Sequence, residues 1–219
     1  MILLPGWGFT WQIFFKPGVF TGLDFDFLLP QRPVTPKTAS SLCTLLHTLV
    51  QQKRRIVILG WSLGGLPAIE AFKSFESDIE KLLLVAVRKE YTANEIETQR
   101  NLVKIDHSKA LSDFYRRCFL GQKKDLRWFK SEIMGYCLRA CSMHCLLEGL
   151  DYLLQPIETA CLDNEKVCLV YGSKDALIPK DLRIRLKRAC TSVLPNTGHA
   201  PFLSSAFEAV FAQTLQSKR

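Results

Sequence analysis

The stretch that decides the fold of this chain is residues 56–65, which read IVILGWSLGG. A β-branched apolar run breaks here into a glycine-rich turn, which is typical of a buried strand that turns sharply into a helix. A strained strand-turn-helix lifts the hydroxyl at its apex out of the backbone, where a base can reach it. Gly60 and Gly64 let neighbouring backbone pass close to this turn. Ser62 is therefore the first candidate for a nucleophile, although Gly-x-Ser-x-Gly also occurs in ordinary turns.

The residues on both sides of this stretch predict alternating strands and helices. Apolar periodicity and Gly/Pro boundaries predict strands at residues 1–4, 23–29, 56–59, 79–87, 166–171 and 190–194, and helices at residues 38–52, 63–75, 179–188 and 201–216. Such alternation indicates an α/β protein with a mostly parallel sheet of about six strands and helices on both faces.

Residues 88–160 interrupt the alternation, because strand signals vanish and the segment reads as several amphipathic helices. We therefore predict an α/β core formed by residues 1–87 and 161–219, with residues 88–160 inserted as a helical lid. Between Lys109 and Arg139 the insertion carries eight basic residues against three acidic ones, more than half of the net charge of +8 of the whole chain. Such a concentration of charge can steer an acidic partner.

The composition is that of a soluble globular protein, with 219 residues of which 47% are hydrophobic and 23% charged. No apolar run reaches the roughly 18–20 residues that span a bilayer. The apolar start from Met1 to Phe15 has no basic residue before Lys16 and is interrupted by Pro5, so we interpret it as a core strand and loop rather than a signal peptide. The eight cysteines show no disulfide spacing, so we expect reduced thiols and a cytoplasmic location.

Three cysteines, Cys137, Cys141 and Cys145, recur every four residues, with His144 beside the last of them. A metal cluster is one interpretation of this spacing. Tetrahedral zinc sites usually pair CxxC-type loops rather than stack ligands along one helix face. We therefore favour a core-facing stripe of small residues and predict no metal site.

A serine hydroxyl needs a base beside it, usually a histidine that a carboxylate orients. His47, His107 and His144 lie in predicted helical segments, and we interpret them as surface or structural residues. His199 follows the last strand, and functional groups of a parallel sheet collect on loops at the carboxyl ends of its strands. His199 is therefore the predicted base, in the chain order expected for a partner of Ser62.

The carboxylate should follow another strand and stand between the serine and the histidine in the chain. Asp175 meets both conditions, since it follows the strand that ends at Tyr171. The alternative is an Asx turn before the next helix. Asp163 precedes its strand and Asp151 lies in the insertion, so neither is preferred.

An acyl-transfer serine also needs hydrogen-bond donors where negative charge develops. The backbone N–H of Leu63, at the start of the helix after Ser62, is one candidate. The loop after the first strand should supply the second, and Trp7 in Pro5-Gly6-Trp7-Gly8 is the candidate there. A simple tight turn is the alternative explanation of those glycines.

These segments, taken in order, resemble the α/β-hydrolase superfamily from end to end and, within it, the BioH-type carboxylesterases, the pimeloyl-[acyl-carrier protein] methyl ester esterases of biotin synthesis. The resemblance rests on four motifs: Gly6-Trp7-Gly8, Gly60-Trp61-Ser62-Leu63-Gly64-Gly65, Tyr171-Gly172 with Asp175 and Leu177-Ile178-Pro179, and Gly198-His199-Ala200-Pro201-Phe202.

The resemblance implies a serine carboxylesterase that removes the methyl ester of pimeloyl-[acyl-carrier protein] through an acyl-enzyme, with no metal or organic cofactor. Members of that family meet the acidic carrier protein with basic residues of a helical lid. By position, these are Arg116, Arg117, Arg127 and Arg139 here, and a solvated helix face is the alternative for each. We expect a monomer with neither a nucleic-acid nor a membrane partner.

The sequence departs from the family pattern in two places. It begins directly at the strand before Gly6, so we do not expect the antiparallel strands that usually open this fold. A smaller sheet follows, with an edge that something must cover. Pro5 stands where many relatives have His before Gly, which bears on the geometry of the oxyanion loop.

Two other functions fit the same residues. One is a general short-chain carboxylesterase or thioesterase, which uses the same chemistry on another substrate. The other is a non-catalytic binding protein that keeps the hydrolase scaffold and holds an acidic partner with its basic lid. The complete set of Ser62, Asp175 and His199 argues against the second, because a binder needs none of the three.

Overall fold

The structure is a computed structural model that describes residues 1–20 and 25–216. Within these residues the centre is a five-stranded sheet in which the spatial order of the strands equals their order in the chain. Every neighbouring pair is parallel, as the alternation of strands and helices predicted. The strands are β1 (Ile2–Leu4), β2 (Ile56–Trp61), β3 (Ile79–Val85), β4 (Val167–Gly172) and β5 (Cys190–Leu194).

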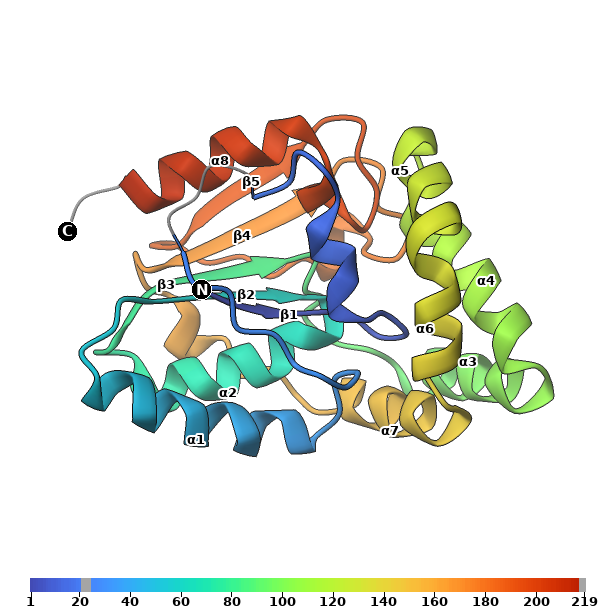
Figure 1. The fold of residues 1–219 in the computed structure, drawn as a ribbon, viewed down its shortest axis with the longest axis horizontal. Helices are drawn as coiled ribbons and strands as arrows, with labels where there is room; N and C mark the ends of the chain where they lie inside the picture. The colour runs from blue at the N-terminus through green and yellow to red at the C-terminus, as the bar shows by residue number, and fades with distance from the viewer. Residues whose placement is uncertain (21–24, 217–219) are drawn as a thin grey trace.

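Helices cover both faces of this sheet (Figure 1). On one face lie α1 (Lys37–Gln51) and α2 (Gly65–Phe75), and on the other lies α8 (Ser205–Gln216). Short turns of helix complete the core: η1 (Trp11–Phe15), η2 (Ser62–Gly64), η4 (Ala160–Leu162), η5 (Lys180–Leu182) and η6 (Pro201–Leu203).

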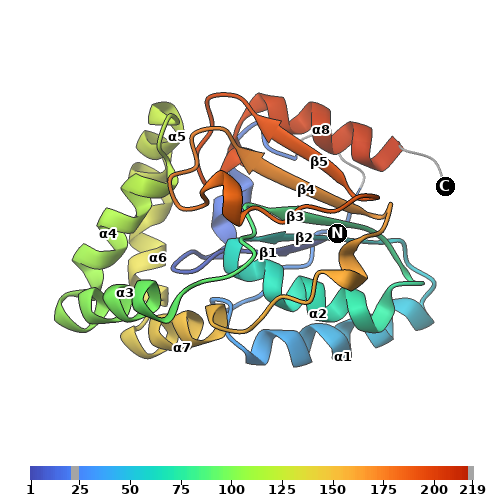
Figure 2. The same ribbon diagram turned by 180° about the vertical axis from the view of Figure 1, so that it is seen from behind.

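Residues 88–160 lie between β3 and β4 in the chain and contain no strand, as predicted. Their helices gather at the carboxyl ends of the strands, and Figure 2 shows the same arrangement from behind. We call residues 88–160 the helical insertion. Its elements are α3 (Ala93–Ile105), α4 (His107–Cys118), α5 (Lys123–Trp128), the π-helical turn η3 (Phe129–Ile133), α6 (Met134–Ala140) and α7 (Met143–Leu153).

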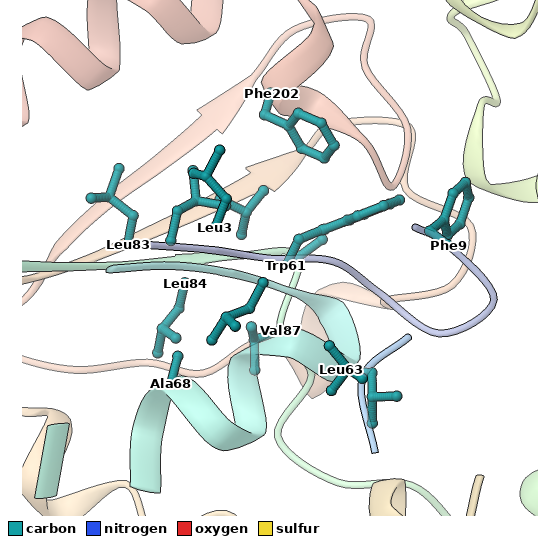
Figure 3. Packing of buried hydrophobic residues seen from close by; sticks show 14 of the residues in the cluster. Leu3, Phe9, Trp61, Leu63, Ala68, Leu83, Leu84, Val87 and Phe202 are labelled. Atoms are coloured by element: carbon teal, nitrogen blue, oxygen red, sulfur yellow. The ribbon is translucent and has the colours of Figure 1, made fainter. Parts of the chain in front are cut away.

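The core forms because the central strands are apolar on both faces. Residues Leu3, Leu59 and Leu83 are in register across three strands and are fully buried, as is Trp61 two residues along β2. The Trp61 ring packs between Phe9 and Phe202, with ring centroids 4.5 and 4.9 Å away (Figure 3). Burial of each such side chain stabilises the fold by about 1.5–3 kcal/mol, and the strands thereby hold the loops at their carboxyl ends in fixed positions.

Two predicted elements differ in the structure. Of the strand predicted at residues 23–29, residues 23 and 24 lie outside the described part of the chain, and Leu28 forms only a single parallel bridge with Ile2. The Leu28 N–H donates to the Met1 carbonyl and the Leu3 N–H to the Leu28 carbonyl. Pro30 has no N–H, so pairing cannot continue beyond it. The bridge nevertheless partly covers the outer edge of β1.

The prediction of a helix at residues 179–188 is wrong. Only the turn η5 forms there, and the chain then becomes extended because its polar groups are bound elsewhere. Arg183 pairs with Arg88 in an antiparallel bridge, and its guanidinium donates to the Gly172 carbonyl at 2.8 Å. The Ile184 N–H donates to the Tyr171 hydroxyl at 3.1 Å instead of to a helical carbonyl. Among the helices of the described residues, none has the length and apolar character needed to cross a bilayer.

We predict that Gly64→Ala destabilises the protein by about 3 kcal/mol or more, because a Cβ there would lie 2.2 Å from the Leu4 carbonyl oxygen and the packed core cannot yield. Denaturant unfolding measures the change. Gly135→Ala is the matched control: its Cβ would meet only the flexible Arg139 side chain at 3.4 Å, and alanine favours the helix by up to about 1 kcal/mol. Equal stability of the two variants would contradict the prediction.

Candidate active site

Ser62 lies at the turn from β2 into η2, at the carboxyl end of the sheet. Its φ is +52°, in the left-handed region that costs a non-glycine residue about 1–2 kcal/mol. The turn is held because Gly60 and Gly64 let α2 and the end of β1 pack against it, where a Cβ on either would meet backbone at 2.6 and 2.2 Å. The strained turn predicted around Ser62 is therefore present.

Asp175 and His199 form a buried pair. They lie in the loops after β4 and β5, and the His199 Nδ1 is 2.9 Å from the Asp175 Oδ2. The other carboxylate oxygen accepts the N–H groups of Leu177 and Ile178 at 2.9 and 3.2 Å, which fixes the orientation of the carboxylate. Because the carboxylate accepts the proton on Nδ1, the imidazole Nε2 is left as the basic nitrogen.

The loop of His199 is held from two sides. On the core side, the Trp61 indole N–H donates to the His199 carbonyl at 2.7 Å, so the residue before Ser62 binds the histidine loop directly. On the other side, the His199 N–H donates to the Cys118 carbonyl at the end of α4 at 2.7 Å. Gly198 fits there because a Cβ would lie 2.5 Å from that same carbonyl oxygen.

Gln122, which follows α4 in the helical insertion, reinforces this contact. Its side chain is buried, accepts from the Gly198 N–H at 2.9 Å and donates to the Ala200 carbonyl at 2.9 Å. It also donates to Asp125, which pairs with Lys16 at 2.5 Å. The insertion therefore takes part in placing the histidine, a role that we did not predict because Gln122 belongs to no motif.

The loop after β1 reaches Ser62 from the other side. A Cβ on Gly6 would lie 3.2 Å from the Ser62 Cβ, which brings the backbone of this loop against the serine. The Trp7 side chain is anchored by a hydrogen bond from its indole N–H to the Leu146 carbonyl of α7 at 2.8 Å. Gly149 of α7 packs on both Trp7 and Leu63, where a Cβ would meet their side chains at 2.8 and 3.2 Å.

Ser62 and His199 open into one cavity of about 330 Å³ between the core and the helical insertion. Its lining is mixed, with apolar side chains from the insertion such as Leu102, Phe114 and Leu150 beside charged ones. The cavity thus offers both apolar and charged side chains to a bound molecule.

Three residues near Ser62 were not predicted as site residues: Arg88, Tyr91 and Glu95. Arg88 is 6% exposed, its guanidinium lies over the Tyr91 ring at 4.6 Å from the centroid, and it binds Glu95 at 2.8 Å. This hydrogen bond and those from Thr92 lower the pKa of Glu95 to about 2. One sequence feature could have identified these three residues. They follow the strand that neighbours the strand of Ser62, and functional groups collect on such loops.

Other residues weighed from the sequence lie away from this cavity. His47 packs against the Phe75 ring, His107 begins α4, and His144 is exposed beside Glu148. Asp163 accepts the Arg188 N–H at 2.7 Å, and Asp151 pairs with Arg100.

The four insertion arginines are exposed but occupy different places. Arg116 and Arg117 lie in the last turn of α4, where Arg116 pairs with Asp113 at 2.6 Å and Arg117 lines the cavity. Arg127 lies on α5 and Arg139 on α6, where its guanidinium stacks on the Tyr136 ring.

The cysteine stripe faces inward. Cys137 and Cys141 are fully buried, Cys145 is partly so, and burial raises the pKa of all three thiols. In the part of the chain that the structure describes, no three or more His, Cys, Asp or Glu side chains are grouped so as to hold a metal ion. Cys137 instead lies 3.4 Å from the Thr10 hydroxyl.

A strained serine at a strand-to-helix turn and a histidine-carboxylate pair at later strand ends are features of one enzyme class, and the sequence comparison agrees. The model of the alpha/beta hydrolase family matches residues 1–213, so the chain belongs to that family. The class is therefore that of the hydrolases.

Particular relatives narrow the class. The chain is 26% identical to the pimeloyl-[acyl-carrier protein] methyl ester esterase of Pectobacterium atrosepticum, over 93% of this chain and 88% of the relative. It is 30% identical to the protein of the same name from Neisseria meningitidis serogroup B, over 68% of this chain and 64% of the relative. The resemblance to BioH-type esterases stated from the motifs is thus confirmed.

Solved structures share the fold. An esterase from Exiguobacterium antarcticum superposes with a TM-score of 0.73 at 20% identity, covering 99% of this chain and 90% of that one. A bromoperoxidase from Bacillus anthracis superposes with a TM-score of 0.72 at 17% identity, covering 99% and 91%. Proteins with different activities share this architecture, so the substrate must be argued from the site.

The pKa of Glu95 predicts a pH-dependent contribution to stability. Because that pKa is about 2 in the folded protein and ordinarily 4.5, ionised Glu95 stabilises the fold above pH 4.5, and this contribution is lost as the pH falls toward 2. Glu95→Gln should therefore unfold at lower urea concentration than wild type at pH 7, with a difference that shrinks between pH 4.5 and pH 3. Glu97→Gln on the same helix controls for loss of charge, and a pH-independent difference for Glu95→Gln would contradict the prediction.

Proposed function

We propose that this protein is a serine carboxylesterase in which Ser62, His199 and Asp175 form a catalytic triad. The observation that carries the proposal is the buried 2.9 Å pair of Asp175 and His199, which shares one cavity with a serine held at φ +52°. Asp175 keeps the imidazole in the tautomer with its proton on Nδ1 and stabilises the imidazolium that forms during the reaction.

The reaction begins when His199 Nε2 takes the Ser62 proton and Ser62 Oγ attacks the ester carbonyl. The backbone N–H groups of Trp7 and Leu63 stabilise the oxyanion of the tetrahedral intermediate. Their assignment is supported by the contact of Gly6 with Ser62 and by the packing of Gly149 on both residues. Collapse expels the alcohol with the proton from His199, and a water molecule then releases the acid from the acyl-enzyme.

The preferred substrate in this proposal is the methyl ester of pimeloyl-[acyl-carrier protein], in biotin synthesis. Support comes from relatives of that name, which align over most of the chain. The cavity adds support, because its leucine side chains suit a chain of several methylene groups and its arginines suit polar ends. A general short-chain carboxylesterase or thioesterase is the alternative with the same chemistry.

We further propose that the helical insertion acts as a lid and meets an acidic carrier protein. The insertion lies at the carboxyl ends of the strands, its helices α3, α4 and α7 line the cavity, and it carries the exposed Arg117, Arg127 and Arg139. Exposed positive charge near the cavity would speed the encounter with an acidic partner, because rim charges act mainly on the association rate.

We predict that Ser62→Ala lowers kcat by a factor on the order of 10⁶, and Asp175→Asn by about 10⁴, since the nucleophile and the imidazole tautomer are lost. The assay offers p-nitrophenyl esters and the methyl ester of pimeloyl-[acyl-carrier protein] to purified wild type and variants. His47→Gln is the matched control for a histidine outside the cavity. If wild type and Ser62→Ala are equally inert on every ester, the esterase proposal is refuted.

The substrate is tested separately in a biotin auxotroph that lacks its own pimeloyl methyl ester esterase. Growth restored by wild type and not by Ser62→Ala supports the carrier-linked substrate. If the protein hydrolyses p-nitrophenyl esters well but does not restore growth, the esterase proposal stands and the carrier-linked substrate is refuted.

Charge reversal tests the docking of the carrier protein. Arg127→Glu with Arg139→Glu should lower kcat/KM for the carrier-linked ester by about tenfold at low salt and leave a p-nitrophenyl ester unchanged. Arg116→Glu should lower kcat/KM less, because Arg116 is already paired with Asp113. Arg117→Glu should also lower kcat/KM for small esters, because Arg117 lines the cavity. Lys187→Glu, before β5 at the opposite end of the sheet, is the control. Equal rates on the carrier-linked ester would exclude docking by these arginines.

A further inference from the structure

The mechanism above leaves one group near the reacting serine without a role. Tyr91 lies in the loop after β3, the strand that neighbours β2 and the turn of Ser62. Both residues line the same cavity, together with His199. A phenol beside the nucleophile can donate a hydrogen bond to any oxygen that approaches the serine.

The order of the strands decides from which side Tyr91 approaches. β1, which carries the loop of Trp7, is the neighbour of β2 on one side, and β3 is its neighbour on the other. Asp175 and His199 follow β4 and β5, beyond β3. The loop of Tyr91 therefore follows the strand on the histidine side of β2, opposite to β1 and the oxyanion loop.

This side is where the leaving group of an ester must lie. The carbonyl oxygen faces the oxyanion donors, and the leaving oxygen faces the histidine that protonates it. A donor that approaches from the histidine side is therefore placed for the leaving oxygen rather than for the carbonyl oxygen.

The surroundings of Tyr91 hold its ring in place and keep its proton. Arg88 is buried and lies over the ring at 4.6 Å, and Glu95 binds Arg88 at 2.8 Å. Glu95 is itself fixed, because it accepts the Thr92 N–H and hydroxyl at 3.0 and 2.8 Å in the capping box of α3. Burial raises the pKa of Tyr91, so the hydroxyl is a donor throughout the neutral range.

We propose that Tyr91 is a further catalytic residue, which donates a hydrogen bond to the leaving oxygen of the ester and so makes the site selective for oxygen esters over thioesters. The inference rests on the proposed esterase function of Ser62. As the intermediate collapses, the C–O bond breaks, its electron pair goes to the leaving oxygen, and His199 Nε2 supplies the proton while Tyr91 keeps its own. A thioester places sulfur at the same position, and sulfur is a weak acceptor that gains little from this donor.

Tyr91→Phe tests the proposal, because it removes the hydroxyl and keeps the ring under Arg88. The substrates are a matched pair with one acyl chain, methyl hexanoate and S-methyl thiohexanoate, and the measured quantity is kcat/KM, which reports acylation. We expect kcat/KM for the oxygen ester to fall about tenfold and that for the thioester to change less than twofold. Tyr136→Phe, at an exposed position of α6, is the matched control and should change neither.

The outcomes separate the possible roles of Tyr91. An equal fall on both substrates would assign Tyr91 a structural role and overturn the proposal, as would no fall on either. Arg88→Met provides a second variant, because it frees the Tyr91 ring and should lower the ratio of oxygen-ester to thioester rates in the same direction. Failure of the esterase proposal gives a different result, because Ser62→Ala would then hydrolyse the oxygen ester as fast as wild type.

Discussion

At Gly64 the backbone of the turn after β2 passes so close to the end of β1 that a methyl group there would lie 2.2 Å from the Leu4 carbonyl oxygen. The same turn holds Ser62 at a strained φ of +52°, and the loop of Gly6 and Trp7 packs beside it. The buried core around Trp61 offsets the free-energy cost of this strained backbone, because its packed side chains hold the turn in place (Figure 3). The loops of His199 and Gly6 both contact this turn, the first through Trp61 and the second through Ser62.

The helical insertion takes part in the site as much as the sheet does. The end of α4 accepts the N–H of His199, and Gln122 binds the backbone on both sides of that histidine. On the opposite side of Ser62, α7 accepts the Trp7 indole N–H and packs its Gly149 against Leu63. Residues 88–160 therefore hold the loop of His199 on one side of Ser62 and Trp7 on the other. This makes the insertion a structural part of the candidate active site.

Agreement between sequence and structure follows the strength of the local signals. β2, β3 and β4 were predicted closely, because short runs of Val, Ile and Leu between turn residues are typical of strands buried on both faces. The helix prediction at residues 179–188 failed because Pro179 and the following residues resemble a helix start. The contacts that keep Arg183 and Ile184 extended come from Arg88, in the loop after β3, and from β4. Leu28 pairs at a single residue for a local reason, the proline two positions later. The monomeric state and the cytoplasmic location stay predictions.

The sequence by itself determined the order and type of the elements, the parallel sheet, and the places of Ser62, Asp175 and His199 at strand ends, because these depend on apolar periodicity and on chain order. Only the tertiary structure decided that Asp175 meets His199 at 2.9 Å, that Gln122 and Cys118 hold the histidine loop, and that Tyr91 and Arg88 line the cavity of the serine. Those contacts join residues far apart in the chain, or residues of no motif. They exist because the sheet brings the carboxyl ends of its strands to one edge and the insertion packs over that edge.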